Sequence, residues 1–153
     1  ATPFCESMTR RLDNFGAEAK AFSGLAAAAK GDLRLAGSEF AAGHAVAPPD
    51  SGLPVRLMFF EAWAAMKARD MERAERLIRE VNDRAANSGH AEGYRSFRAH
   101  AWWLLGEGFI ATDQKPRACA PLAESARLYA EVGGDAGRAA VEALRVAAGC
   151  RPG

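Results

Sequence analysis

The chain has 153 residues, of which 49% are hydrophobic, and this size is typical of one folding unit with its own core. Its 20 basic and 19 acidic residues leave a formal charge of +1, which gives no attraction toward DNA, RNA or anionic lipid. No apolar run approaches the roughly 20 residues that span a bilayer. Composition therefore predicts a single domain that binds neither nucleic acid nor membrane.

Apolar residues recur every three or four positions along the first part of the chain, a spacing typical of a helix. They are Phe4, Met8, Leu12, Phe15, Ala19, Phe22, Leu25 and Ala29. Either one long helix or two short ones with a break near Gly16 would carry this stripe, and Gly31-Asp32 is the expected stop. The same spacing predicts further helices over residues 33–46, 54–68, 71–87, 91–112, 115–131 and 135–149.

Turn residues separate these expected helices. Pro48-Pro49-Asp50-Ser51-Gly52 predicts a loop, and Asn87-Ser88-Gly89 predicts a helix end with a left-handed cap. Gly133-Gly134-Asp135 predicts the end of one helix and the cap of the next. Since β-branched residues are sparse and strict alternation is absent, no strand is expected and the fold class is all-α.

The most specific pattern is Trp102-x-x-Leu105-Gly106-x-x-Phe109, followed by Ala118-x-x-x-Leu122. A Gly among large apolar residues lets a second helix approach closely, and an Ala four residues before a large residue does the same on that second helix. The segment resembles a tetratricopeptide repeat (TPR), a helix-turn-helix unit. A fainter copy reads Gly24, Gly31-Asp32, Ala36-x-x-x-Phe40 and Pro48, and the faintest reads Ala62, Ala65, Arg69-Asp70 and Ala74-x-x-x-Ile78.

The small residues that open the second helices, Ala36, Ala74 and Ala118, are 38 and 44 residues apart, whereas a regular array repeats every 34. Such irregular repeats are similar to those of large bacterial regulators and signalling proteins. The resemblance implies a short α-solenoid of about three TPR-like repeats with flanking helices. Its expected parts are an N-terminal helix over 1–16, repeats over 17–50, 55–89 and 91–132, and a capping helix over 135–149.

In the TPR family the first helix of each repeat lines a concave surface. Helical phase places eight residues of the second and third repeats there: Arg56, Phe59, Trp63, Lys67, His100, Trp103, Glu107 and Ile110. Aromatic anchors of this kind would bind a partner peptide or helix. The alternative is that these aromatic rings are core residues or are covered by a flanking helix, and Trp102 belongs to the core in both cases.

The best-known TPR ligand is a C-terminal carboxylate held by a clamp of Lys, Asn and Arg. Ala21 and Leu25 occupy the positions where the first repeat would need Lys and Asn, so this ligand is not expected. The three histidines, His44, His90 and His100, lack partners at metal-ligand spacing, and no phosphate-binding Gly loop occurs. We therefore expect no catalysis, no metal and no cofactor.

Two functions follow from these patterns: a protein-interaction scaffold, or alternatively a sensory, effector-binding domain of a larger bacterial transcriptional or signalling regulator. The partner in the first case is a protein or peptide. A third interpretation is self-association through an apolar face of the last helix. That face consists of Ala139, Ala140, Ala143, Leu144 and Val146.

The cysteines bear on the compartment. Cys119 lies 14 residues before Gly133 and Cys150 lies 17 after it, so in an antiparallel helical hairpin their heights differ by roughly 4 to 5 Å. Either a disulfide or two reduced thiols fits this spacing, and Cys5 stays outside the pair. A bridge would favour an exported or periplasmic protein, which also fits a chain that begins at Ala1, whereas reduced thiols favour the cytoplasm.

Overall fold

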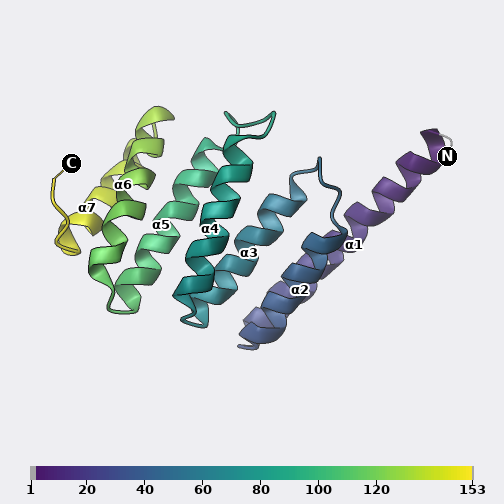
Figure 1. Ribbon diagram of the computed structural model, residues 1–153, viewed down its shortest axis with the longest axis horizontal. Helices are drawn as coiled ribbons and strands as arrows, with labels where there is room; N and C mark the ends of the chain where they lie inside the picture. The colour runs from purple at the N-terminus through teal and green to yellow at the C-terminus, as the bar shows by residue number, and fades with distance from the viewer. Residues whose placement is uncertain (1–2, 153) are drawn as a thin grey trace. The chain divides into compact units, whose positions relative to one another are not determined.

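A computed structural model describes residues 3–152, and within this range the chain is helical, with seven α-helices and no strand (Figure 1). The prediction of an all-α fold is confirmed. The helices are α1 (Pro3–Ala29), α2 (Leu33–Val46), α3 (Leu53–Lys67), α4 (Met71–Ala86), α5 (Arg95–Ala111), α6 (Lys115–Glu131) and α7 (Asp135–Ala147).

The helix ends agree with the sequence prediction within two residues, with one exception. Of the two interpretations of the N-terminal segment, the continuous helix is correct, since α1 runs through Gly16 without a break. The exception is α5, which begins at Arg95 and not near residue 91, because residues 87–94 form successive turns. Gly89 is also not in the left-handed conformation expected of it, and the end of α4 is closed instead by Asn87, whose Nδ2 donates to the Asp83 carbonyl oxygen 2.8 Å away.

The same tight turn connects four pairs of consecutive helices, and a fifth residue with positive φ, Gly149, follows α7. Each of the four turns contains one residue with positive φ, at Gly31 (82°), Arg69 (63°), Asp113 (60°) and Gly133 (68°). A residue in this conformation reverses the chain after a helix, and Gly adopts it without the steric cost that Arg and Asp bear. The next helix then begins at once: after the first two of these turns Asp32 and Asp70 accept hydrogen bonds from the backbone N–H groups of Leu35 and Arg73.

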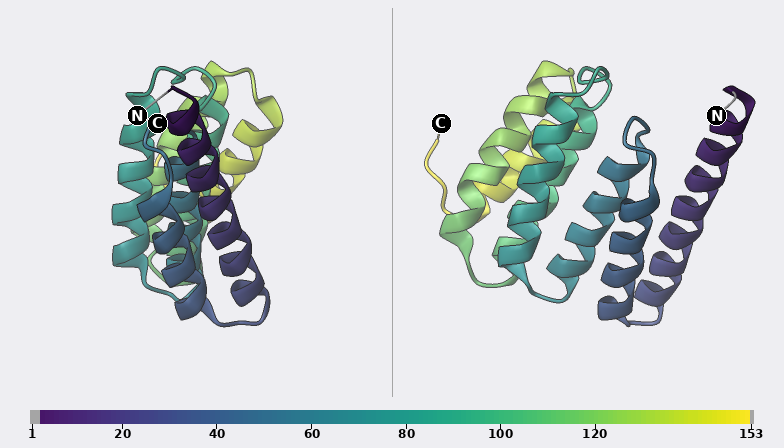
Figure 2. Two further views of the ribbon diagram at one scale, coloured as in Figure 1. Left: turned by 90° about the vertical axis from the view of Figure 1, so that its right-hand side faces the viewer. Right: turned by 45° about the vertical axis from the view of Figure 1, so that its right-hand side comes forward.

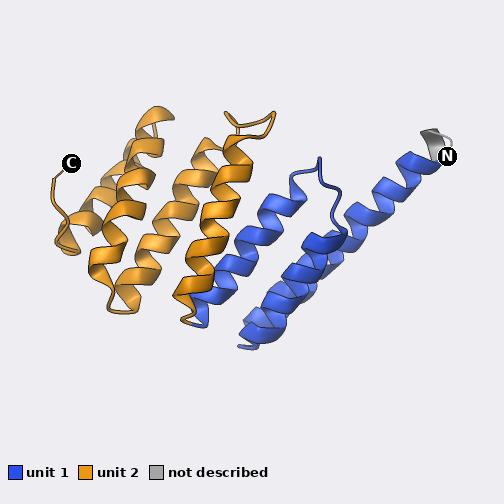
Figure 3. Ribbon diagram, viewed as in Figure 1, with its two compact units in different colours: residues 1–68 blue, residues 69–153 orange. Residues whose placement is uncertain are grey.

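The chain divides into two compact units, Ala1–Ala68 and Arg69–Gly153 (Figure 3). Unit 1 contains α1 to α3 and unit 2 contains α4 to α7. The division falls in the turn between α3 and α4, within the second of the three expected repeats. Each unit is therefore described by itself, and the single domain of three repeats stays a prediction.

In unit 1, α2 packs against both α1 and α3. Phe40 of α2 is fully buried, and its ring occupies the space that a side chain at Gly24 of α1 would need: a Cβ there would lie 2.4 Å from Phe40 Cε1. Leu53 and Leu57 of α3 complete this core together with small residues of the other two helices. The close approach explains why the first repeat pattern pairs a Gly with a Phe.

The first helix of unit 1 buries small residues and exposes large ones. Its buried positions are Ala17, Gly24 and Ala27, which lie on the side of α1 that packs in the unit. Its large apolar residues are exposed: Met8, Leu12, Phe15, Phe22 and Leu25. Phe4, the first member of the expected stripe, lies outside the described side chains. With 27 residues against 14, α1 also extends beyond α2 toward its N-terminus (Figure 2).

In unit 2, α5 and α6 make the equivalent close contact. A Cβ at Gly106 of α5 would lie 2.5 Å from Cδ2 of the buried Leu122 of α6. Ser125 Oγ donates to the Ala99 carbonyl oxygen at 2.7 Å, which satisfies a fully buried hydroxyl and joins the same two helices. Thus both units contain a hairpin in which a Gly of the first helix receives a large side chain of the second.

Two further connections close unit 2. Cys119 of α6 and Cys150, beyond α7, form a disulfide with a Cα–Cα distance of 5.5 Å, so the pairing left open by the sequence is present. Arg117 of α6 donates to Glu72 and Glu75 of α4 at 3.0 and 2.6 Å. These contacts join the first and last helices of the unit to α6.

Candidate functional site

A cavity of about 340 Å³ lies between α1 and α3 in unit 1, and we call it the α1–α3 pocket. Its lining residues are Glu18, Ala21, Phe22 and Leu25 from α1 and Leu53, Arg56, Leu57 and Phe60 from α3. Most of them are apolar, and ligand pockets generally combine such a lining with a few polar groups. Its volume lies at the lower end of the range of about 300 to 1,000 Å³ that is usual for ligand pockets.

The inner wall of the pocket belongs to the core of unit 1. Leu53 and Leu57 are both buried, and the Phe60 ring packs against Phe40 with its centroid 5.4 Å away. The outer wall is exposed, since Phe22 and Leu25 leave 71% and 39% of their surface accessible. The pocket therefore combines a firmly packed base with apolar side chains that a ligand could cover.

Two opposite charges line the same pocket, Glu18 on α1 and Arg56 on α3, and both side chains are exposed. Neither has a nucleophile or a histidine beside it among the lining residues. The groups present can hold an apolar side chain and form polar contacts with a ligand of either charge.

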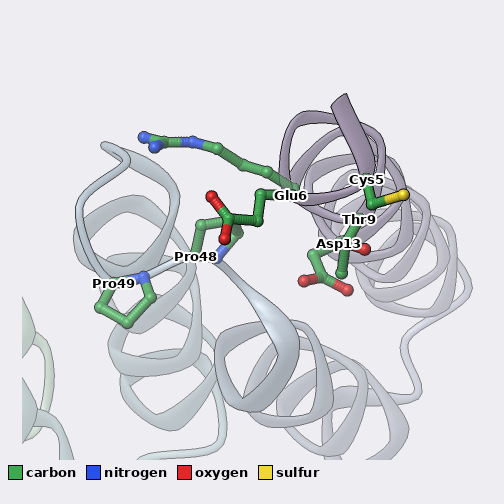
Figure 4. Close-up of a pocket in the computed structure, with 7 residues that line it drawn as sticks. Cys5, Glu6, Thr9, Asp13, Pro48 and Pro49 are labelled. Carbon is green, nitrogen blue, oxygen red and sulfur yellow. The ribbon is translucent and has the colours of Figure 1, made fainter. Parts of the chain in front are cut away.

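A second cavity of about 340 Å³ lies nearer the N-terminus of α1, beside the loop after α2 (Figure 4). It is lined by Cys5, Glu6, Thr9, Arg10, Asp13, Pro48 and Pro49. In Figure 4, Glu6 reaches toward Pro48, whereas the sulfur of Cys5 points away from the two prolines. Asp50 of the same loop pairs with Arg10 at 2.6 Å. The Glu6 carboxylate and the Cys5 thiol thus point in different directions.

No group of three or more metal-ligating side chains occurs within the described part of the chain. The described residues that line the second cavity therefore do not include such a group. We take the α1–α3 pocket as the candidate site because its apolar walls come from two helices whose packing fixes them.

Four of the eight predicted contact residues lie on α3. Arg56 lines the α1–α3 pocket. Phe59 is half-buried beside Phe60, with ring centroids 6.0 Å apart, and Trp63 is half-buried against the core of unit 1. Lys67 is exposed at the end of the helix. Hence Arg56 and Lys67 are accessible to a partner, while Trp63 already contributes to packing.

The other four lie on α5 in unit 2. His100 and Glu107 are exposed, and Ile110 is half-buried. The Trp103 ring makes edge contacts with His100 and with Tyr129 of α6, with centroid distances of 6.0 and 6.1 Å. Burial raises the pKa of the Tyr129 hydroxyl above its usual value. This face of α5 offers aromatic edges and polar groups, and its binding role stays a prediction.

Trp102, which the sequence assigns to the core, is half-buried on α5. The guanidinium of Arg79 from α4 covers its ring at 5.7 Å from the centroid, a cation–π arrangement. Its indole Nε1 is buried, as is that of Trp103, and neither has a hydrogen-bond partner among the described residues. Trp102 thus packs between α4 and α5 at the edge of the unit 2 core.

Sequence reasoning found part of the α1–α3 pocket. Ala21 and Leu25, which occupy the first-repeat clamp positions without the clamp side chains, line this pocket, and so does Arg56, which helical phase placed on the concave surface. Phe22 and Phe60 were missed. Phe22 belongs to the apolar stripe of α1, and its distance of three residues from Leu25 could have indicated that both line one surface.

Among the described helices, none is both long and apolar enough to cross a bilayer. No protein-family model, curated protein or solved structure matches the chain. The all-α fold and the α1–α3 pocket therefore carry the functional argument.

Proposed function

We propose that this chain is a non-catalytic, TPR-like interaction module whose α1–α3 pocket receives apolar side chains of a partner peptide or helix. The observation that carries the proposal is the pocket itself, with a packed base at Leu53 and Leu57 and an exposed apolar wall at Phe22 and Leu25. Exposed apolar surface around a concavity is typical of interaction sites, because covering it releases water.

The two glycine contacts support the TPR-like part of this proposal. The Phe40 side chain packs against Gly24, and the Leu122 side chain packs against Gly106. The Gly and large apolar positions of the TPR pattern thus make the same contact in both units. The tight turns with positive φ recur at equivalent places after the helices. Repetition of one contact and one turn is what a helical-repeat array requires.

The pocket also indicates the chemistry of the partner. Its walls fit one or two bulky apolar side chains, and an amphipathic helix presents such anchors three or four residues apart. Arg56 favours an acidic group on the partner segment near α3, and Glu18 favours a basic group near α1. The partner segment is thus expected to be apolar with charges at its edges.

Selection of random peptides displayed on phage against the immobilised full chain tests this function. We expect enrichment of bulky apolar residues, and Leu25→Glu should weaken binding of a selected peptide about tenfold, because it puts a charge into the apolar wall. Leu35→Glu is the matched control, since Leu35 is 47% exposed on α2 and outside the pocket. No apolar enrichment, or equal losses for both variants, would refute the proposal.

The predicted contact residues on α5 extend the same experiment. If the partner also covers unit 2, Trp103→Ala should weaken the selected peptide further while circular dichroism shows unchanged helicity. Trp63→Ala is a poorer probe, because Trp63 packs on the core of unit 1. Unchanged binding by the Trp103 variant would restrict the site to the pocket in unit 1.

The alternative function is a sensory domain of a larger bacterial regulator, in which a small apolar effector occupies the pocket. The volume of about 340 Å³ favours this alternative over an extended groove. Anilinonaphthalene sulfonate, a fluorescent apolar anion, is a suitable probe. The effector function would be favoured if one dye molecule binds per chain, if Leu25→Glu abolishes this binding, and if the phage experiment selects no peptide.

The disulfide supports placing the module in an oxidising compartment, that is, an exported or periplasmic location. Alkylation of the purified chain in denaturant, followed by measurement of its intact mass, tests this placement. One alkylated cysteine, Cys5, is expected. Three alkylated cysteines would mean that Cys119 and Cys150 are reduced and would favour the cytoplasm.

A further inference from the structure

The exposed apolar residues of α1 follow the heptad repeat of a coiled coil, in which positions a and d alternate at spacings of three and four. Position a is occupied by Cys5, Leu12, Ala19 and Ala26, and position d by Met8, Phe15, Phe22 and Ala29. Every one of these eight residues is exposed. We call this set the α1 seam.

The α1 seam lies away from the packing of unit 1. The residues that α1 buries in its own unit, Ala17, Gly24 and Ala27, fall at the heptad positions f and b, on the far side of the helix. Leu12 and Phe15 are 66% and 72% exposed, near the middle of the helix. A continuous apolar stripe of this length marks an interaction surface.

We infer that the α1 seam pairs with the same seam of a second copy of this chain, with the two helices antiparallel. The twofold axis would pass between Leu12 and Phe15, so that Leu12 of one copy packs against Phe15 of the other. This register also places Met8 opposite Ala19 and Phe22 opposite Cys5. Each large side chain then meets a different and mostly smaller one, as close packing requires.

A parallel pair would pack the seam less well. Identical residues would then share each layer, which places Phe15 against Phe15 and Phe22 against Phe22, while Ala19 and Ala26 would leave voids between these layers. Both overcrowding and voids are destabilising. Side-chain volume therefore favours the antiparallel arrangement.

The charges beside the seam favour the same arrangement. Arg11 and Glu18 occupy position g, and g residues face each other across an antiparallel pair. In the register described, Arg11 of one copy is offset by two residues, about 3 Å, from the level of Glu18 of the other. The twofold axis generates this opposite-charge contact twice. The other flank, at position e, has the uncharged Thr9, Gly16 and Ser23.

Pairing of this kind goes beyond the proposed binding function, and a second copy would compete with the peptide for Glu18 and Phe22, which belong to both surfaces. It predicts that sedimentation equilibrium of the full chain gives a mass twice 16.3 kDa. Phe15→Glu should yield a monomer of unchanged helicity. Val146→Glu is the control, because Val146 is 78% exposed on α7, the helix that the sequence offered for self-association.

Reversal of the flanking charges tests the pairing directly. Arg11→Glu should raise the dissociation constant of the dimer about tenfold, because it replaces two attractive contacts by two repulsive ones. Arg11→Glu combined with Glu18→Arg should restore it. Residues 11 and 18 are seven apart, or two turns, on one helix, and this is too far for direct contact within one copy. A rescue would therefore come from contacts between the two copies.

Cys5 distinguishes the two directions of pairing. In the antiparallel register the two Cys5 residues lie 17 residues apart along the axis, about 25 Å, which is too far for a disulfide. Mild oxidation should therefore produce no covalent dimer, whereas a parallel pair would crosslink.

Four results would each overturn the inference: a covalent dimer, a monomer at every concentration, a dimer that Phe15→Glu leaves intact, or dissociation of the dimer by Val146→Glu. Peptide binding by the monomeric Phe15→Glu variant would leave the proposed function standing.

Discussion

Each of the two units contains a helical hairpin of the same kind, but the units differ in the contacts of their other helices. Gly24 and Phe40 form the central contact in unit 1, and Gly106 and Leu122 form it in unit 2. Unit 2 adds a disulfide and the contacts of Arg117 with α4. Unit 1 has a long first helix whose large residues face solvent.

The difference shows in the exposed apolar side chains. Of the large apolar residues exposed among the described residues, seven belong to unit 1 and two, Val132 and Val146, to unit 2. Exposed apolar groups add little to the stability of the chain that carries them and are available to another molecule. Unit 2 thus has the features of a stabilised support, and unit 1 those of a contact surface.

Removal of the disulfide should have the largest effect on stability and so gives the strongest test of this comparison. Replacing Cys119 and Cys150 by Ser should lower the unfolding free energy by about 3 to 4 kcal/mol, because the bridge spans 31 residues and restricts the unfolded chain. Hydrogen exchange read by unit should show the loss of protection in α6 and α7. An equal loss in α1 to α3 would mean that the units unfold together.

The next largest effect concerns the close glycine contact that occurs once within each unit. Gly24→Ala should cost about 1 to 2 kcal/mol, because the new Cβ would lie 2.4 Å from the buried Phe40 ring and this strain exceeds the gain of helix propensity of about 1 kcal/mol. Gly106→Ala should behave alike.

Gly37→Ala is the matched control for these two glycine variants, because a Cβ at Gly37 of α2 would meet nothing within 4 Å. It should stabilise the chain by about 0.5 to 1 kcal/mol. Urea denaturation measures all three variants. Stabilisation by Gly24→Ala would contradict the tight contact.

A smaller effect tests the ionic contacts of unit 2. Partial burial opposes ionisation of Glu75, but hydrogen bonds from Arg79 and Arg117 outweigh it and hold the pKa of Glu75 below its usual value. The stability from this shift is therefore present above the unfolded-state pKa of Glu75 and is lost as the pH falls through its folded-state pKa. Glu75→Gln should cost about 1 kcal/mol at neutral pH.

The pH dependence of stability separates the effect of the Glu75 charge from that of its packing. The difference in stability between Glu75→Gln and the unaltered chain should shrink in acid, below the usual pKa range of a glutamate. Thermal unfolding at neutral and acidic pH measures both values. A difference that is the same at both pH values would show that Glu75 acts by packing and not by its charge.

The smallest effect is expected on the exposed face of α1. Phe15→Ser should change the stability of the dilute monomer by less than about 0.5 kcal/mol, because the side chain is mostly exposed in unit 1. Chemical denaturation at low protein concentration measures this value. A loss comparable to that of a core residue would mean that unit 1 buries the stripe.

Most of the fold could be predicted from local residue patterns. The spacing of apolar residues gave six of the seven helices within two residues of their ends, because helix formation depends on near neighbours. Gly31 and Gly133 identified two turns, since Gly readily adopts positive φ. Arg69 and Asp113 adopt the same conformation without that composition, so the helix bounds predicted turns there but the residue types gave no indication of the positive φ.

The site was less accessible to prediction because it depends on which surfaces neighbouring helices cover. Helical phase placed Arg56, Phe59, Trp63 and Lys67 of α3 on one concave surface, and of these only Arg56 is among the residues that line the α1–α3 pocket. The same periodicity that predicted α1 gave no indication that Phe15 and Phe22 face solvent, since an apolar stripe has the same pattern whether it is covered or exposed. That distinction requires the positions of α2 and α3.

The disulfide has a consequence for proteolysis. It joins Cys119, in the first turns of α6, to Cys150, beyond the end of α7, so the hairpin of these two helices is a covalent ring. A protease that cuts the Gly133-Gly134 turn opens the ring but releases no fragment until a reductant is added. The chain should therefore migrate as one band without reductant and as two bands with it, and α7 should stay docked after the cut.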